Sequence, residues 1–203
     1  MNAANVSNVR YVVNSTTNYE YYIAMPLENM AQLDKSFWAE SISKLGREKF
    51  LGILSAIDKN VIESRLDVYT HRIDLSYNHP SLKNTEMGFR KWLMYEFKPG
   101  TDLQRTALRK EWLALFEKHD IVRSAALFEG LIGPNEGTIV VLREAKDEET
   151  YIKENKEFWK KTGAEGRALW EKTEALLVKS DTRSGSLRLD LSRLPSSDTQ
   201  VSK

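Results

Sequence analysis

One pattern of residues occurs twice in this chain, and this repetition limits the possible folds more than any other feature of the sequence. Each copy contains Phe-Trp, then Gly-Arg, and finally Arg-(Ile/Leu)-Asp-Leu-Ser. The occurrences are Phe37-Trp38 and Phe158-Trp159, Gly46-Arg47 and Gly166-Arg167, and residues 72–76 and 188–192. A shared order over such a long stretch predicts two copies of one structural unit.

Both copies predict the same order of elements. Apolar runs flank a polar turn at the start of each copy, which predicts a β-hairpin. These hairpins are expected at residues 9–25 and 125–144. A helical spacing of apolar residues follows, and we expect Gly46 and Gly166 to break each helix into two pieces. Alternating residues then predict closing strands that continue through Leu75 in the first copy and Leu191 in the second.

One further strand and helix are predicted between the copies, at residues 91–98 and 101–119. The second half therefore reads strand, helix, hairpin, helix, strand, which is the ferredoxin-like order. The first half reads only hairpin, helix, strand. We predict an incomplete ferredoxin-like repeat at 1–84, a complete one at 85–194 and a polar, disordered tail at 195–203.

Two ferredoxin-like units in one chain resemble the dimeric α+β barrel superfamily in its fused form. The paired Phe-Trp, Gly-Arg and Arg-x-Asp-Leu-Ser pattern is also similar to that of bacterial tandem-repeat members of this superfamily. The resemblance covers about residues 9–194. It implies an α+β fold with clefts between sheet and helices. Monooxygenase-like, haem-degrading and stress-responsive members carry different activities on this fold.

The first unit lacks a leading strand and helix in the sequence as it stands. When the hairpins are aligned, Met1 falls near the end of the position where that helix belongs. We expect either that a strand and a helix are encoded upstream of Met1, or that the barrel is shortened. In the second case a partner chain would cover the exposed sheet edge, and homo-oligomers would form through sheet edges.

Composition narrows the classes of partner and cofactor. The net charge is +1, from 30 basic and 29 acidic residues, which predicts neither a nucleic-acid nor a membrane partner. The chain has no cysteine, which excludes disulfides and thiolate chemistry. No metal-ligand spacing, phosphate loop or dinucleotide fingerprint occurs, so we predict no metal and no cofactor. Without an apolar leader, a cytoplasmic location is the default expectation.

Candidate site residues come mainly from the strands. His71 is the candidate catalytic acid or base; by alternation it shares a face with Tyr69, and Leu187 matches it in the second copy. The alternative is a partly buried histidine that bonds a backbone carbonyl. The candidate ligand-binding residues are Tyr69, Tyr95, Trp112, Arg72 and Arg188.

Arg72 and Arg188 allow two interpretations. Each is followed two residues later by an aspartate, Asp74 or Asp190. The arginines could bind an anionic ligand, or each Arg-Asp pair could hold its closing strand to the preceding loop. We favour the structural interpretation, because the pair recurs in both copies.

Three functions remain open from the sequence. The first is a protein that binds a small molecule in the barrel cleft. The second is a cofactor-independent monooxygenase-like enzyme or isomerase that uses His71. The third is a structural or stress-related protein that forms oligomers. Haem is not expected, because the helices that carry Trp38 and Trp159 contain no histidine.

Overall fold

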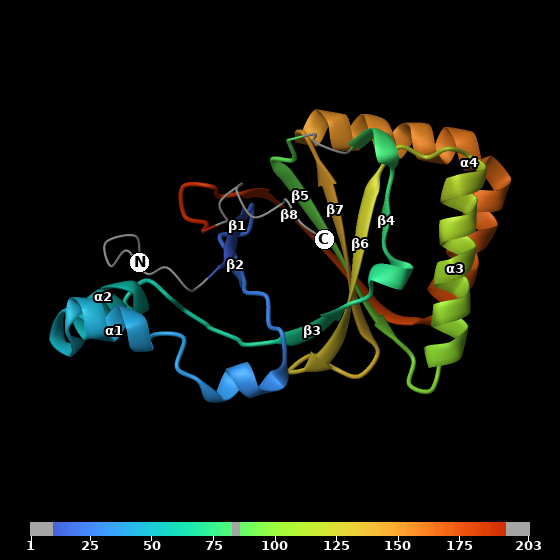
Figure 1. The fold of residues 1–203 in the computed structure, drawn as a ribbon. Helices are drawn as coiled ribbons and strands as arrows, with labels where there is room; N and C mark the ends of the chain where they lie inside the picture. The colour runs from blue at the N-terminus through green and yellow to red at the C-terminus, as the bar shows by residue number, and fades with distance from the viewer. Residues whose placement is uncertain (1–9, 83–85, 194–203) are drawn as a thin grey trace, which may run out of the picture. The chain divides into compact units, whose positions relative to one another are not determined.

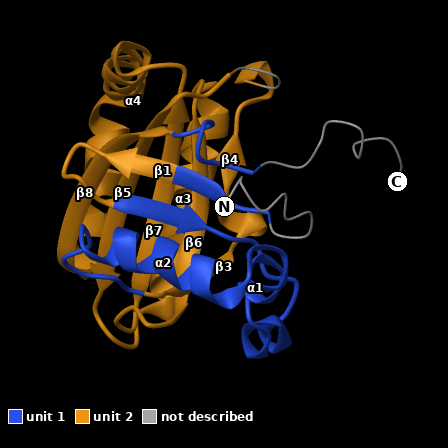
Figure 2. Cartoon of the chain, turned by 90° about the vertical axis from the view of Figure 1, so that its left-hand side faces the viewer, with its two compact units in different colours: residues 1–13, 21–65, 188–203 blue, residues 14–20, 66–187 orange. Residues whose placement is uncertain are grey.

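The computed structural model describes residues 10–82 and 86–193. The described chain forms two compact units, coloured separately in Figure 2. The larger unit contains residues 14–20 and 66–187; the smaller unit contains residues 21–65 and the segments before residue 14 and after residue 187. These two units are defined by compactness, whereas the repeats predicted at 1–84 and 85–194 are defined by sequence similarity. The division into repeats therefore stays a prediction. The predicted tail at 195–203 lies outside the described residues.

The larger unit has a mixed α+β fold (Figure 1). Its elements are β3 (Val68–His71), η3 (Ile73–Leu75), β4 (Tyr77–Asn78), η4 (Pro80–Leu82), β5 (Phe89–Phe97), α3 (Asp102–Lys118), β6 (Ser124–Ile132), β7 (Thr138–Ala145), α4 (Glu148–Leu176) and β8 (Leu177–Leu187). From β5 onward they follow the strand-helix-strand-strand-helix-strand order that the sequence predicts for this segment. None of the helices formed by the described residues is long and apolar enough to cross a membrane.

The strands of the larger unit form a curled antiparallel sheet (Figure 1). Its order is β8-β5-β7-β6-β3, and β4 also pairs with β6. Residues 14–16 of β1 (Val12–Thr16) pair with β8, where Asn14 lies opposite Leu187. All of these pairs are antiparallel.

One face of this sheet carries the main core. Side chains alternate along a strand, so Leu93, Tyr95 and Phe97 of β5 share a face. The buried residues packed there are Leu75, Phe97, Ala125, Leu127, Ile139 and Val141, and Leu176 of α4 packs against them. A second core joins α3 to α4 through Leu108, Leu115, Phe116, Phe158 and Leu169. Helices α3 and α4 therefore cover this face, while the opposite face turns away from them.

Helix α4 shows where the sequence prediction fails. The helix begins after Asp147, whose carboxylate accepts a hydrogen bond of 2.8 Å from the Thr150 amide. The expected break at Gly166 is wrong, because the kink lies at Gly163, with φ 52° and ψ −124°. Gly166 is buried within the helix, and a Cβ atom there would collide with Thr162. Gly166 thus allows close packing, and Gly163 supplies the bend.

The smaller unit contains β2 (Tyr21–Ala24), η2 (Met30–Asp34), α1 (Ala39–Leu45) and α2 (Arg47–Asp58). Here the predicted break is confirmed. Gly46 lies between the two helices with φ 78°, a left-handed conformation that favours glycine. Its amide donates to the Ile42 carbonyl and its carbonyl accepts from the Phe50 amide, so it joins the helices without continuing either.

The first Arg-x-Asp-Leu-Ser motif forms a turn, and the prediction that its closing strand continues to Leu75 is wrong. Strand β3 ends at His71 and the turn follows at once. Arg72 Nε and Nη2 donate to the two carboxylate oxygens of Asp74 at 2.9 and 2.8 Å. Ser76 Oγ donates to the Arg72 carbonyl at 2.8 Å and accepts from the Leu127 amide at 2.9 Å. These side-chain bonds close the turn and tie it to β6.

The second motif has the same geometry within the smaller unit. Strand β8 ends at Leu187, so the predicted strand through Leu191 is also wrong. Arg188 Nε and Nη2 donate to Asp190 at 2.8 and 2.6 Å. Ser192 Oγ donates to the Arg188 carbonyl at 2.6 Å and accepts from the Val13 amide at 2.9 Å. The repeated residues therefore encode a strand-ending turn.

Candidate functional site

A group of polar side chains lies within the larger unit, between the sheet and helices α3 and α4. We call it the interior cluster; it consists of Tyr95 (β5), Arg109 (α3), Arg123 (just before β6), Arg143 (β7), Tyr151 and Glu154 (both α4). Tyr95 and Arg143 project from the helix-covered face, since Tyr95 pairs in register with Ile139 and side chains alternate along β7. The cluster thus lies between the sheet and the helices, where the sequence predicts a ligand, and ligand binding there stays a prediction.

Arg123 is buried against aromatic rings. It is 6% exposed, and its guanidinium carbon lies 4.0 Å from the centre of the Phe158 ring and 5.1 Å from that of Phe116. Such contacts are favourable cation–π interactions. They do not satisfy N–H groups, however, and the Nε and Nη2 atoms of Arg123 have no hydrogen-bond partner among the described residues.

Arg143 is buried more deeply and is only partly paired. It is 3% exposed, and its Nη2 lies 3.4 Å from Glu154 Oε2, a long contact for a charge-assisted hydrogen bond. Its guanidinium carbon lies 5.3 Å from the centre of the Tyr151 ring. Arg143 Nε also lacks a hydrogen-bond partner within the part of the chain that the structure describes.

Arg109, by contrast, has backbone partners. Its Nε donates to the Leu75 carbonyl at 2.7 Å and its Nη2 donates to the Ala125 carbonyl at 3.1 Å. Burial lowers the pKa of Arg109, and the positive charge of Arg143 lowers it further. Arg109 therefore fastens α3 to the sheet, and its charge adds to the positive potential around Arg143.

The interior cluster carries more positive than negative charge. Burial is the main cause that lowers the pKa values of Arg123 and Arg143, and Arg143 adds to the effect on Arg123. Arginine nevertheless stays protonated in proteins at neutral pH. Three guanidinium groups thus face one carboxylate, that of Glu154. Buried charges are normally paired, because taking an ion out of water is costly.

Glu154 connects the interior cluster to a hollow on the surface. The hollow has a volume of about 300 Å³ and is lined by Ile121, Val122, Thr150, Lys153, Glu154, Glu157, Phe158 and Lys161. Glu154 and Phe158 each line the hollow and also contact an arginine of the cluster. The Glu154 side chain is 13% exposed, and burial raises its pKa although Arg143 opposes this effect.

Comparison with known proteins supports the fold alone. No protein-family model and no curated protein sequence matches the chain. Among solved structures, an anthrone oxidase-like protein is similar with a TM-score of 0.59 and 12% identity, over 92% of this chain and 79% of that one. A putative monooxygenase from Lactobacillus acidophilus NCFM is similar with a TM-score of 0.52 and 8% identity, over 88% and 77%. The mixed α+β fold with a curled antiparallel sheet is thus shared with both proteins.

Two of the predicted ligand-binding residues lie at or beside the interior cluster. Tyr95 belongs to it, and burial raises the pKa of its hydroxyl to about 12. Trp112 lies in the contact between α3 and α4. Its Nε1 donates to Thr173 Oγ1 at 3.0 Å, and its ring centre lies 6.1 Å from that of Phe158.

His71 and Tyr69 lie on the opposite face of the sheet from Tyr95. His71 pairs with Phe128, which pairs with Val140, and these partners share a face. The His71 ring stacks on Phe128 at 4.8 Å, and its Nε2 lies 3.3 Å from Ser76 Oγ. Catalysis by His71 and ligand binding by Tyr69 stay predictions.

Arg72 and Arg188 lie in the two strand-ending turns. Each forms the expected pair with an aspartate, and Arg72 also contacts Glu129 at 2.8 Å. The hydrogen bonds to these carboxylates raise the pKa values of both arginines. Each Arg-Asp pair lies within the turn after its strand and does not join the strand to the preceding loop. Anion binding at either residue stays a prediction.

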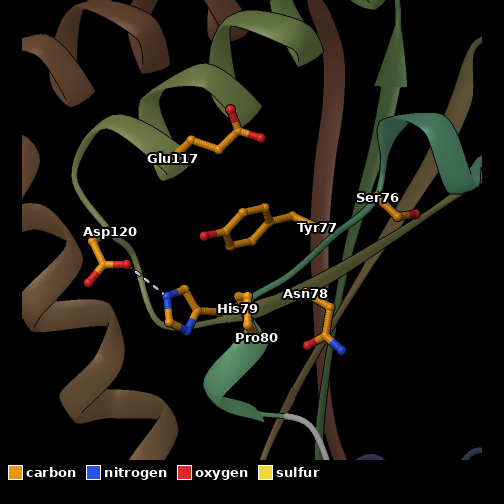
Figure 3. Close-up of a pocket in the computed structure, with 7 residues that line it drawn as sticks. All are labelled: Ser76, Tyr77, Asn78, His79, Pro80, Glu117 and Asp120. Carbon is orange, nitrogen blue, oxygen red and sulfur yellow. Dashed lines mark hydrogen bonds and ion pairs between the residues drawn. The ribbon is translucent and has the colours of Figure 1, made fainter.

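A second hollow lies around His79, which sequence reasoning left aside. Its volume is about 490 Å³, and its lining residues are those drawn in Figure 3. His79 Nε2 lies 2.8 Å from Asp120 Oδ1, and its Nδ1 lies 2.7 Å from Ser81 Oγ. The bond from His79 lowers the pKa of Asp120. Since the Ser81 amide also donates to Nδ1, His79 caps the short η4 helix and ties it to the end of α3.

Sequence reasoning missed Arg123, Arg143 and Glu154. One signal was present: Arg143 follows Ile139 and Val141 with a period of two, so it occupies an inward position of a buried strand. Glu154 lies four residues before Phe158 and therefore on the same helix face. Within the described residues, no group of three His, Cys, Asp or Glu side chains could hold a metal ion.

Proposed function

We propose that the larger unit binds a small aromatic molecule between its sheet and helices α3 and α4 and oxidises it with dioxygen, as a monooxygenase-like enzyme. The observation that carries this proposal is the position of Glu154. It is a half-buried carboxylate with a raised pKa, placed between an open hollow and buried cationic groups. Such groups are candidate general bases.

Other features of the site suit an aromatic ligand. Small-molecule sites are concave, largely apolar and carry a few placed polar groups. Here Phe116, Tyr151 and Phe158 surround the arginines, and the adjoining hollow of about 300 Å³ is the size of a small ligand site. The names of the two similar structures, an anthrone oxidase-like protein and a putative monooxygenase, agree with this chemistry.

The proposed reaction converts an activated CH₂ group into a carbonyl, R₂CH₂ + O₂ → R₂C=O + H₂O. Glu154 removes one C–H proton, and the electron pair moves onto a conjugated oxygen of the substrate. The carbanion then reduces dioxygen and forms a C–O bond, and the peroxide takes the proton from Glu154. Loss of the second C–H proton with cleavage of the O–O bond releases water. Tyr95 stays protonated, with a pKa of about 12, and can donate a hydrogen bond.

We also infer that β5 to β8 form a ferredoxin-like unit and that the chain is a fused pair of such units. The strand order β8-β5-β7-β6 around two helices supports the first inference. The second is supported by exchanged pairings: β3 of the first copy pairs with β6, and β8 of the second copy pairs with β1. The same Arg-x-Asp-Leu-Ser turn follows β3 and β8.

Oxygen uptake tests the proposed reaction. The purified protein is supplied with anthrone and with related compounds that carry an activated CH₂ group, and products are analysed by mass spectrometry under ¹⁸O₂. We expect substrate-dependent oxygen uptake with one ¹⁸O atom in the new carbonyl. Glu154→Gln should lower the rate by about 100-fold or more, the usual contribution of a general base.

Glu171→Gln is the matched control, because Glu171 is an exposed glutamate on the same helix and does not line the hollow. It should keep the wild-type rate within about twofold, since surface substitutions change little. Binding of these compounds without any oxygen uptake would leave a small-molecule-binding protein and reject the enzyme. An unchanged rate in Glu154→Gln would reject Glu154 as the base.

A further inference from the structure

We propose that Arg123 and Arg143 form a binding site for an oxyanion of the ligand, a phenolate, enolate or carboxylate, which replaces Glu154 as the partner of Arg143. This inference specifies the ligand class at the site of the proposed function and rests on it for the location. It does not require catalysis, so binding and turnover can fail separately.

Unpaired donors carry the argument. Arg123 is 6% exposed and leaves Nε and Nη2 unbonded, and Arg143 is 3% exposed and leaves Nε unbonded, among the residues that the structure describes. A buried donor without a partner loses its hydration and gains nothing in return. Two such arginines side by side also repel each other, and Arg143 lowers the pKa of Arg123. A bound anion would accept hydrogen bonds from the unpaired donors and would offset the repulsion between the two arginines.

The type of donor indicates the type of ligand. A guanidinium group presents a planar set of N–H donors that matches the two lone-pair directions of a carboxylate or the oxygen of a phenolate. The arginines lie against the phenyl rings of Phe116 and Phe158 and the phenol ring of Tyr151. An aromatic anion would place its charge on the N–H groups and its ring among these side chains.

Glu154 occupies the place of this anion in the structure. Its contact with Arg143 is long, at 3.4 Å, and burial raises its pKa. A carboxylate held this loosely is easier to displace than one with a short, bidentate contact. Because Glu154 also lines the hollow, it can turn toward the hollow when an anion arrives. Once separated from Arg143, it would be a stronger base.

The rim of the hollow favours entry of an anion. Lys153 and Lys161 lie on it, and Lys161 is held in position because its Nζ donates to the Asp120 carbonyl at 3.1 Å. Positive groups along an entrance raise the local concentration of anions. Glu157 lies on the same rim and partly offsets them.

The site should reduce the stability of the ligand-free protein. Replacing a buried, unpaired charge by an apolar side chain of similar volume is often neutral or stabilising. Arg123→Met and Arg143→Met should therefore leave the melting temperature unchanged or raise it while they weaken anion binding. A purely structural arginine would behave in the opposite way, because its removal would lower the melting temperature.

The experiment measures binding of 1-naphthoate by isothermal titration calorimetry, with the neutral isostere 1-naphthamide as the comparison ligand. Wild type should bind the anion at least about tenfold more tightly than the amide. Arg123→Met and Arg143→Met should raise the Kd for naphthoate by about 10- to 100-fold, the effect of losing one charged hydrogen bond. They should change the Kd for the amide by less than about threefold. Arg167→Met, at an exposed position on α4, is the matched control and should bind both ligands like wild type.

Glu154→Gln separates this inference from the proposed reaction. It removes the competing internal anion, so it should bind naphthoate more tightly than wild type does, even though it cannot act as a base. Higher anion affinity with no oxygen uptake in any variant would support the anion site and reject the oxidation. The anion site is overturned if wild type binds naphthoate no better than naphthamide, or if Arg123→Met and Arg143→Met both lower the melting temperature and keep the wild-type affinity.

Discussion

Two groups of arginines in the larger unit differ in how their charges are balanced. In the first group, Arg72 and Arg105 share the carboxylate of Glu129, with contacts of 2.8 Å to each of its oxygens. Arg72 also pairs with Asp74, and Arg105 also pairs with Asp102. We call these five residues the Glu129 network. It has three carboxylates for two arginines, whereas the interior cluster has one carboxylate for three arginines.

We expect such a difference between a structural group of charges and the ligand site proposed above. The Glu129 network joins the turn after β3, strand β6 and helix α3, and every arginine in it has short carboxylate partners. The interior cluster is buried more deeply and leaves three donors of Arg123 and Arg143 unbonded among the described residues, whereas the Glu129 network leaves one, Arg105 Nε. Folding alone would favour apolar residues at those two positions. Binding of an anion gives a reason for arginine there.

The largest expected effect on stability follows from breaking the balanced group at its centre. Glu129→Ala removes the carboxylate that Arg72 and Arg105 share and leaves both short of a partner. We expect the free energy of unfolding to fall by about 3 kcal/mol, at the lower end of the range for a broken buried ion pair because Glu129 is partly exposed. Urea denaturation of the two proteins measures this. A loss below about 0.5 kcal/mol would place the network among ordinary surface pairs.

A matched pair of substitutions sharpens the comparison. Arg105→Met in the Glu129 network should destabilise the protein by about 1–2 kcal/mol, because it leaves Glu129 and Asp102 short of a cation. Arg143→Met in the interior cluster should be neutral or stabilising for the reason given above. Thermal unfolding of both variants in the same buffer shows whether each substitution lowers or raises the stability of the protein. If both are destabilising to the same degree, the interior arginines are structural and the contrast disappears.

The two strand-ending turns provide a smaller reference value with neutral groups. Ser76→Ala leaves the Leu127 amide without its hydroxyl partner, and Ser192→Ala does the same to the Val13 amide. Each should cost about 1 kcal/mol, the net value of one hydrogen bond. Equal losses would show that the two copies of the motif are equivalent in energy as well as in geometry. A difference of more than about 1 kcal/mol would show that only one turn supports its strand.

The sequence predicted the elements that depend on local patterns. The order of elements from β5 to β8 follows from the spacing of apolar residues and from the turn residues. Gly46 ends α1 because a residue with positive φ interrupts a helix whatever its surroundings. The two turns were predicted as strands, since Ile73 and Leu75 alternate as strand residues do. The hydrogen bonds that bend the chain there are made by the polar residues Arg72, Asp74 and Ser76. The spacing of apolar residues therefore does not predict these bonds.

Some remaining features lack an apolar signal, and others depend on packing between segments. The position of the kink is a local feature without an apolar signal: Gly163 has non-helical angles, whereas Gly166 stays helical at a place where a Cβ atom would collide with Thr162. Tyr95 is a candidate because it is an aromatic residue on a predicted strand, and its role as a ligand contact stays a prediction. Arg123 and Arg143 lie at opposite ends of the β6–β7 segment, and the packing of this hairpin against α4 brings Arg123 to Phe158 and Arg143 to Glu154.

The smallest expected effect is on the pH dependence of stability, which also tests the contrast between the interior cluster and the Glu129 network. Burial raises the pKa of Glu154 in the folded state, so between the ordinary glutamate value and the raised one the folded protein binds more protons than the unfolded chain. The contribution of Glu154 to stability is therefore present at low pH and is lost as pH rises through the folded pKa. Asp74 has the opposite sign, because Arg72 lowers its pKa: its contribution is present at neutral pH and is lost as pH falls.

Urea denaturation of wild type, Glu154→Gln and Asp74→Asn between about pH 4 and pH 7 measures both effects, and other carboxylates cancel in the differences. Relative to wild type, Glu154→Gln should gain stability as pH rises, and Asp74→Asn should lose it. Opposite slopes would mean that the interior cluster disfavours its own carboxylate while the Glu129 network depends on its carboxylates. Slopes of the same sign would mean that Glu154 is an ordinary partner of Arg143, and a ligand anion would then have no reason to replace it.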